Sequence, residues 1–284
     1  MEQLVSKVSL SKKDFLRFSK FIHTEFGIKM PPAKKVLLES RLQKRLRKLE
    51  LKTFEEYHDY LFSPEGRTNE LPQFINQITT NKTDFFREPN HFDFLSQEAL
   101  PNLMKNHRGA HTNLTVWSAG CSTGEEPYTL AIILNEYISK NPNLRLNFSI
   151  FATDISSEVI QKAKQAVYKQ AMVAPIPLML KKKYLLKSKD KRSDLVRVVP
   201  ELRWQVEFER LNFMDKDYGL KKPVDIIFCR NVLIYFDRPT QEAILNRLCR
   251  YLKKGGFFFQ GHSESVQGMD LPLKPVFPTI YQKT

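Results

Sequence analysis

The sequence predicts an α/β protein with a parallel sheet, preceded by a smaller helical module. Residues 1 to about 78 show only helical periodicity, whereas from about Leu114 short apolar runs alternate with helical stretches. Strands and helices that alternate through short turns indicate a parallel sheet covered on both faces. A chain of 284 residues has room for one or two domains. We therefore expect two, residues 1–78 and residues 79–284.

The helical module contains one strongly patterned helix. Its leucines at 38, 42, 46 and 49 share one face, and further helices are expected over 12–25, 53–62 and about 70–78. Beside the leucines runs a basic stripe made of Lys34, Arg41, Lys44, Arg45, Lys48 and Lys52. Such a stripe is either a solvated face or a docking surface for an acidic partner. The scarcity of acidic residues at helical spacing favours docking.

The strands of the second part are expected at 114–119, 148–152, 206–209, 224–229 and 257–260. Helices are expected from about residue 125, after residue 156 and over 240–252, and the turn Lys253–Gly256 should end the last of these. In a parallel sheet the ligand binds beyond the carboxyl ends of the strands. The residues that follow these strands are therefore the candidates for chemistry.

Charge and composition limit the partners. The chain has 45 Lys and Arg against 31 Asp and Glu, a formal charge of +14, which attracts nucleic acid, an anionic membrane surface or an acidic protein. The longest apolar run, residues 171–180, is too short to span a membrane, and the first residues do not read as a secretory signal. Three cysteines without a CxxC pair predict a reduced, cytoplasmic protein without a metal site.

The loop after the first strand holds the most informative residues. It runs from Gly120 to Glu126 and matches neither a dinucleotide fingerprint nor a P-loop. Its glycines allow a ligand close to the backbone, while Glu125 and Glu126 repel phosphate and favour a cation or a hydroxyl, or merely complement the helix dipole. Asp154, at the end of the second strand, is placed to accept from ribose hydroxyls. A nucleoside with a cationic tail and no phosphate fits, and S-adenosylmethionine is such a molecule.

Five motifs then resemble the CheR family of chemotaxis receptor methyltransferases. They are Thr83–Glu88 with His91 and Phe92, Trp117–Tyr128, Ala152–Ile155, Phe228–Asp237 and Gly261–Glu264. The resemblance covers nearly the whole chain. It implies a Rossmann-like domain that transfers a methyl group from S-adenosylmethionine to glutamate carboxylates of chemotaxis receptors, leaving glutamate methyl esters and S-adenosylhomocysteine.

The resemblance also assigns residues. The cofactor-binding positions that it implies are Asn81, Thr83, Arg87, Glu125, Asp154, Asn212, Phe213, Arg230 and Asn231. Arg87 and Tyr235 match the catalytic positions, with Tyr235 facing the transferred methyl. A glutamate carboxylate is already an anion at pH 7, so this chemistry needs orientation by hydrogen-bond donors rather than a general base. We accordingly set aside His262 and the cysteines as catalysts.

The resemblance further implies a small antiparallel β-subdomain, inserted at about 168–205. In some members this subdomain grips a peptide at the receptor's C-terminus, but the loop of this chain reads Lys187-Ser-Lys-Asp-Lys-Arg192, without the glycine of those members. The expected partners are the cytoplasmic methylation helices of receptors, met by a monomer without nucleic acid or membrane insertion. Two alternatives stay open: a nucleic-acid methyltransferase, which the charge would suit, and a cofactor-binding sensor without activity.

Overall fold

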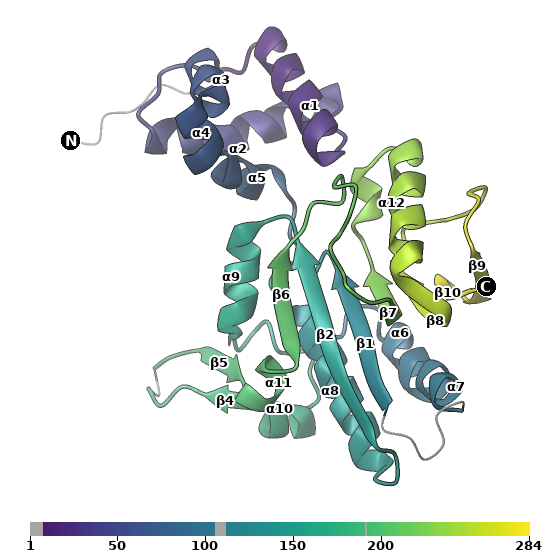
Figure 1. Ribbon diagram of the computed structural model, residues 1–284. Coiled ribbons are helices and arrows are strands. Elements are labelled where there is room, and N and C mark those ends of the chain that lie inside the picture. Colours follow the sequence, from purple (N-terminus) through teal and green to yellow (C-terminus); the bar gives the residue numbers. More distant parts are fainter. Residues whose placement is uncertain (1–7, 106–111, 191) are drawn as a thin grey trace. The chain divides into compact units, whose positions relative to one another are not determined.

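The computed structural model describes residues 8–105, 112–190 and 192–284, which form two compact units (Figure 1). The helical unit comprises the chain up to Thr80 together with Asn212–Met214 and Tyr235–Asp237, and the sheet unit comprises the remainder. The first seven residues, which bear on the expected lack of a signal, and residue 191 of the basic loop lie outside the described ranges.

The helical unit contains five α-helices among its described residues. They are α1 (Lys12–Phe26), α2 (Lys35–Lys48), α3 (Phe54–Phe62), α4 (Pro64–Asn69) and α5 (Leu71–Ile78), with a 3-10 turn, η1 (Pro32–Lys34), before α2. Stacked and tilted rings of Phe18, Tyr57 and Phe74 fill the core. The Ser63–Gly66 turn starts α4, because the Ser63 hydroxyl caps the Gly66 amide and Pro64 occupies the first helical turn.

Two short segments from far along the chain complete the helical unit. Ile28 forms a β-bridge with Phe236, and the Lys29 amide donates to the Tyr235 carbonyl at 2.8 Å. Gly27 has φ +68°, and a Cβ there would lie 2.7 Å from Met214 Sδ and 2.8 Å from the Phe236 ring. Only glycine therefore lets these segments pack against the end of α1.

The sheet unit is built on seven strands in the order β6-β2-β1-β7-β8-β10-β9. Their bounds are β1 Thr112–Ala119, β2 Leu146–Asp154, β6 Val206–Arg210, β7 Val224–Cys229, β8 Leu252–Gln260, β9 Leu273–Phe277 and β10 Ile280–Lys283. The first five in this order are parallel, and β10 and β9 add an antiparallel edge. This edge was not predicted, because the prolines of the segment indicate a loop.

Helices flank the sheet on both faces, so its central strands are apolar on both sides. The covering helices are α6 (Pro89–Phe94), η2 (Leu95–Ala99), α7 (Leu100–Met104), α8 (Glu125–Lys140), α9 (Ser157–Gln165) and α12 (Arg238–Tyr251). Of these, η2 is a π-helical turn joining α6 to α7. The last helix ends at Tyr251, close to the predicted position, but the reading of Lys253–Gly256 as a turn is wrong: these residues belong to β8, whose register against β7 shifts there. The glycines open an irregularity within the strand and do not end it.

A second, three-stranded antiparallel sheet lies beside α9 in Figure 1. It consists of β3 (Val167–Lys169), β5 (Leu195–Val198) and β4 (Leu185–Lys187) in that order, with α10 (Leu178–Tyr184) between β3 and β4 and α11 (Pro200–Arg203) after β5. The predicted fold class is thereby confirmed in its three parts: helical domain, sheet with helices and small antiparallel sheet. Among the described residues, no helix is long and apolar enough to cross a bilayer.

Candidate cofactor and active site

The candidate site lies where β1, β2 and β7 end side by side. Because these strands are neighbours and parallel, the loop after Ala119, the residue Asp154 and the pair Arg230–Asn231 all emerge at one edge of the sheet. The segment from Asn81 to Glu88 joins them, since the Ser122 hydroxyl donates to the Asn81 carbonyl at 2.8 Å. The sheet unit thus brings together seven of the predicted cofactor residues, Asn81, Thr83, Arg87, Glu125, Asp154, Arg230 and Asn231.

Asp154 is fixed by the backbone around it. Its carboxylate accepts from the Ser122 amide at 2.9 Å and from the Ser156 amide at 3.0 Å. Burial raises the pKa of Asp154, and these backbone bonds oppose the rise. The Ile155 amide adds a third backbone bond, so the carboxylate is held at the end of β2, the position from which acidic residues accept from ribose hydroxyls in dinucleotide-binding folds.

Glu125 is the acidic residue that points to a cationic ligand. Its Oε2 accepts from the Thr123 hydroxyl at 2.7 Å, while its buried Oε1 has no partner in the described parts of the chain. Burial raises the pKa of Glu125 to about 7. A buried carboxylate oxygen without a donor is costly, and an ammonium group of a bound ligand would satisfy it.

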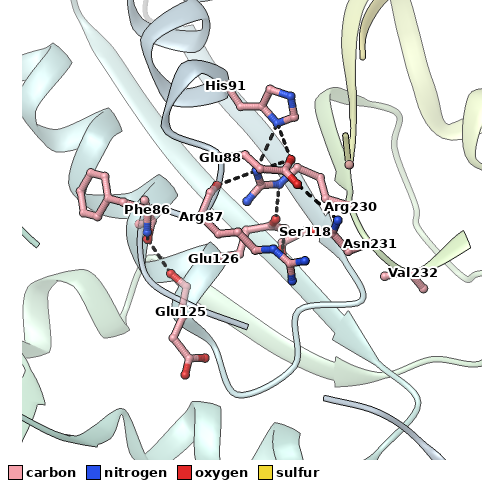
Figure 2. Close-up of polar contacts among 12 residues, drawn as sticks. Phe86, Arg87, Glu88, His91, Ser118, Glu125, Glu126, Arg230, Asn231 and Val232 are labelled. Atoms are coloured by element: carbon pink, nitrogen blue, oxygen red, sulfur yellow. Dashed lines mark hydrogen bonds and ion pairs between the residues drawn. The ribbon is translucent and has the colours of Figure 1, made fainter. Parts of the chain in front are cut away.

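Glu126 does not share this role, which corrects the expectation of two carboxylates facing a ligand. Its side chain accepts from the Ser118 hydroxyl and from Arg230 Nε, both at 2.7 Å (Figure 2). The two glycines of this loop are also required by the fold itself. A Cβ on Gly120 would lie 2.4 Å from Val232 Cγ2 and one on Gly124 2.9 Å from the Tyr168 hydroxyl, so the protein's own packing already requires both.

Arg230 is the centre of a buried polar network. Besides Glu126, its guanidinium contacts the Arg87 carbonyl at 2.8 Å, His91 Nδ1 at 3.1 Å and Glu88 Oε2 at 3.4 Å. The side chain is 3% exposed, and its Nε and Nη1 are engaged by acceptors of the protein itself. The structure thus gives this guanidinium contacts within the fold, and the cofactor contact that the resemblance implies stays a prediction.

Arg87 is the more open of the two arginines. It is half-buried, and its Nη1 donates to the Lys82 carbonyl at 3.2 Å. The residues on either side, Phe86 and Glu88, have φ of +56° and +58°, so the backbone is strained on both sides of Arg87. Such strain persists only where the surroundings hold it, which is typical of functional sites.

The sequence indicated that Glu264 takes part in a network within its loop, but not how many groups it holds. Its carboxylate accepts four backbone amides, those of Asn231, Val232, Leu233 and Gly261, at 2.6–2.9 Å. This fixes the loop after β7, in which Asn231 has φ +60°. The signal in the sequence is an acidic residue shortly after a buried strand.

Glu88, His91 and His262 place three potential metal ligands within 4.8 Å of one another. His91 Nδ1 faces the Arg230 guanidinium, and its Nε2 lies 2.9 Å from Thr279 Oγ1, so the network assigns the proton to Nε2. Burial and the neighbouring Arg230 lower the pKa of His91 to about 4. With both ring nitrogens engaged beside a guanidinium, the cluster is a poor site for a cation.

Three of the predicted site residues belong to the helical unit and not to the sheet unit, namely Asn212, Phe213 and Tyr235. Asn212 donates to the Glu25 carbonyl at 2.9 Å, and the Phe213 ring packs against Phe236. Lys34 Nζ lies 5.9 Å from the centre of the Tyr235 ring.

The basic stripe on α2 needs a correction. Arg45 is buried and makes a two-pronged ion pair with Glu70 at 2.8 and 2.6 Å, and the Tyr57 hydroxyl donates to the same carboxylate. Arg41 is half-buried and donates to the Ile78 carbonyl and the Thr80 hydroxyl. The prediction that Arg45 lies on a docking face is wrong, because its charge is used inside the fold.

The residues of the stripe that are exposed are Lys44, Lys48 and Lys52, and Lys34 is partly buried. Arg47, which was not included in the stripe, is also exposed and lies one helical turn from Lys44. We call Lys44, Arg47, Lys48 and Lys52 the α2 basic face. A separate cavity of about 630 Å³ lies between α6, α7 and the β8–β10 edge and contains none of the predicted site residues.

Comparison with known proteins agrees with this geometry. Residues 81–281 match the family model described as CheR methyltransferase, SAM binding domain, and residues 13–79 match the model described as CheR methyltransferase, all-alpha domain. The chain is 40% identical to a chemotaxis protein methyltransferase of Borreliella burgdorferi, covering 97% of this chain and 96% of that protein. It is 38% identical to the Salmonella typhimurium protein of the same name and 37% to that of Escherichia coli, in each case over 98% of this chain and 93% of the relative.

Proposed function

The chain belongs to the CheR methyltransferase family and is an S-adenosylmethionine-dependent methyltransferase, and we propose that it methylates glutamate side chains of chemotaxis receptors. The cofactor and the enzyme class follow from the family. The receptor glutamate as acceptor is the proposal. It is supported by the names of the full-length relatives, which are chemotaxis protein methyltransferases.

The observation that most supports the proposal is the half-buried side chain of Arg87. It lies in the segment that joins the strand ends of the candidate cofactor site. Arg87 offers a guanidinium with one main-chain partner among the described residues. A guanidinium fork suits a carboxylate, which is the acceptor group proposed here. S-adenosylmethionine supplies an activated methyl group on a sulfonium. The protein then has to hold the acceptor carboxylate in line with the methyl–sulfur bond and to exclude water from it, which requires no general base.

The roles of the other residues follow from their contacts. Asp154 would accept from the ribose hydroxyls, and Glu125 would accept from the cofactor's ammonium group through its unpartnered Oε1. Tyr235 of the helical unit would direct its hydroxyl toward the transferred methyl, as its match in the family motif implies. The α2 basic face would attract the acidic surface of a receptor helix.

The test uses tritiated S-adenosylmethionine with receptor-containing membranes and the purified protein. Label that is released as methanol by base identifies a carboxyl ester and supports the proposal. Base-stable label in protein contradicts the proposal. Label found in RNA or DNA also contradicts it and would favour the nucleic-acid alternative. Membranes that lack the receptors provide the control.

A further inference from the structure

Arg87 is held in place by residues that do not themselves belong to the exposed part of the site. Its neighbours Phe86 and Glu88 both have left-handed backbone conformations, which side chains larger than glycine rarely adopt. A segment strained twice in three residues requires contacts that fix it on each side. The question is which contacts do so.

On one side, the Phe86 amide donates to the Thr129 hydroxyl at 3.2 Å. On the other side, Arg230 Nη1 donates to the Arg87 carbonyl at 2.8 Å and lies 3.4 Å from Glu88 Oε2. Glu88 Oε1 also accepts from Asn231 Nδ2 at 3.3 Å and from the His262 amide at 3.4 Å. The strained segment is therefore tied to the loops after β7 and β8 mainly through Arg230 and Glu88.

The surroundings of Arg230 are built for this purpose. Its guanidinium carbon lies 5.2 Å and 5.5 Å from the centres of the Phe92 and Phe228 rings. Glu126 accepts from its Nε (Figure 2). Burial alone would raise the pKa of Glu88, but Arg230 and Asn231 lower it overall, so Glu88 is a carboxylate beside the guanidinium. A planar fork contacting four groups in different directions cannot be replaced by the single ammonium of lysine.

We propose that Arg230 is a positioning residue: its guanidinium acts on methyl transfer through Arg87 and does not itself contact the cofactor. The inference depends on the proposed function, because it takes Arg87 to orient the acceptor carboxylate. Loss of the fork would free the Arg87 carbonyl and let the strained segment relax. The Arg87 guanidinium would then no longer be oriented toward the acceptor carboxylate. Cofactor binding would be retained, because it depends on Asp154 and Glu125.

The experiment is a double-mutant cycle on Arg230→Lys and Arg87→Ala, read as kcat/KM for receptor at saturating S-adenosylmethionine. We expect each single variant to lose at least tenfold and the double variant to lose no more than Arg87→Ala alone, because the two act as one unit. In Arg230→Lys, the Kd of S-adenosylhomocysteine, measured by calorimetry, should stay within about threefold of the wild type. A further tenfold loss in the double variant overturns the inference, as does a raised Kd with unchanged kcat.

Two further variants keep the result interpretable. Glu88→Gln places an amide nitrogen against Arg230 but keeps an oxygen for Asn231 and His262, so a smaller loss that disappears in the Arg87→Ala background is expected even if Arg230→Lys does not fold. If Glu88→Gln retains its full effect in that background, the inference is wrong. Arg45→Lys, which alters another buried guanidinium, in the helical unit, controls for general destabilisation. If Arg87→Ala itself methylates receptors normally, the proposed role of Arg87 fails, and the inference with it.

Discussion

At the scale of single residues, the burial of Glu125 makes its protonation state depend on whether a cationic ligand is bound. Its pKa is raised to about 7 because the side chain is buried, with the Thr123 hydroxyl as its hydrogen-bond donor. Near neutral pH a large share of the unliganded protein therefore carries a proton on this carboxyl group. A cationic ligand binds the ionised form better, so binding must release that proton.

We therefore expect the Kd of S-adenosylmethionine to rise about tenfold when the pH falls from 8 to 6, because a group with a pKa near 7 goes from mostly ionised to about one tenth ionised. Calorimetry in buffers of different ionisation heat would also count the released proton. Glu125→Gln should bind more weakly and lose this pH dependence. An equally steep dependence in Glu125→Gln would assign the proton to another group.

Tyr235 is a test of chemistry rather than of binding. Tyr235→Phe removes only a hydroxyl that is proposed to face the reacting centre, so kcat should fall while the Kd of S-adenosylmethionine stays near the wild-type value. Rapid-quench measurement of one turnover, together with calorimetry, separates the two quantities. A higher Kd with an unchanged single-turnover rate would show that the hydroxyl serves binding instead.

The sequence predicted these residues unevenly, for a physical reason. Asp154 and Glu125 follow directly from strand ends and helix starts, which local patterns reveal. Glu126 and Arg230 could not be separated from ligand-binding residues by sequence, because their partners lie about a hundred positions apart in the chain. Only the folded structure shows that these two charges neutralise each other away from solvent.

At the scale of elements, α2 shows how far helical periodicity reaches. Of the predicted apolar face, Leu38, Leu42 and Leu46 are buried, while Leu49, just after the helix, is partly buried. Arg45, placed in the basic stripe, is buried as well. A helical wheel gives the direction in which each side chain leaves the helix axis. It does not show which other elements cover that side chain. Glu70 and Tyr57, from α5's start and α3, turn that flank of the helix into part of the core.

Breaking this pair should be costly. Arg45→Ala leaves Glu70 as a buried carboxylate with the Tyr57 hydroxyl as its remaining side-chain partner, and removing one member of a buried ion pair typically costs about 3–5 kcal/mol. We expect the free energy of unfolding of the helical unit to fall by an amount of that size, as measured by urea denaturation. Lys48→Ala, on an exposed position of the same helix, should change it by less than about 0.5 kcal/mol. Equal small effects would mean that the pair contributes little.

The edge of the main sheet shows the opposite limit. The five parallel strands were predicted because buried strands read as continuous apolar runs. The β9–β10 hairpin was not, since Pro275 removes a backbone donor and proline argues against a strand. Its position explains the exception: β9 is the outermost strand in the sheet order, and proline is tolerated in edge strands because one side of such a strand pairs with no neighbour.

At the scale of the whole molecule, the net charge of +14 acts beyond any one contact. A large positive field speeds encounter with any acidic surface, whichever face carries the charges. The proposal of receptor docking requires more, namely that the α2 basic face contributes more than the same number of charges elsewhere. Net charge and location can be separated, because the chain carries a second basic cluster around the small antiparallel sheet.

The comparison uses two charge-reversed variants. One replaces Lys44, Arg47 and Lys48 by Glu, and the other replaces Lys182, Lys187 and Lys189, which are also exposed. Each lowers the formal charge from +14 to +8, since every replacement removes one positive and adds one negative charge. The KM for receptor is measured at several salt concentrations, and the Kd of S-adenosylmethionine serves as a check on the cofactor site.

We expect the α2 variant to raise the KM severalfold at low salt and to show a flatter salt dependence, because exposed charges act over about 8–10 Å at physiological ionic strength. The second variant should change the KM much less, with both variants binding S-adenosylmethionine normally. If the two raise the KM equally, docking depends on net charge alone. If neither does, the exposed lysines of α2 are a solvated face, and the receptor is recognised through other contacts.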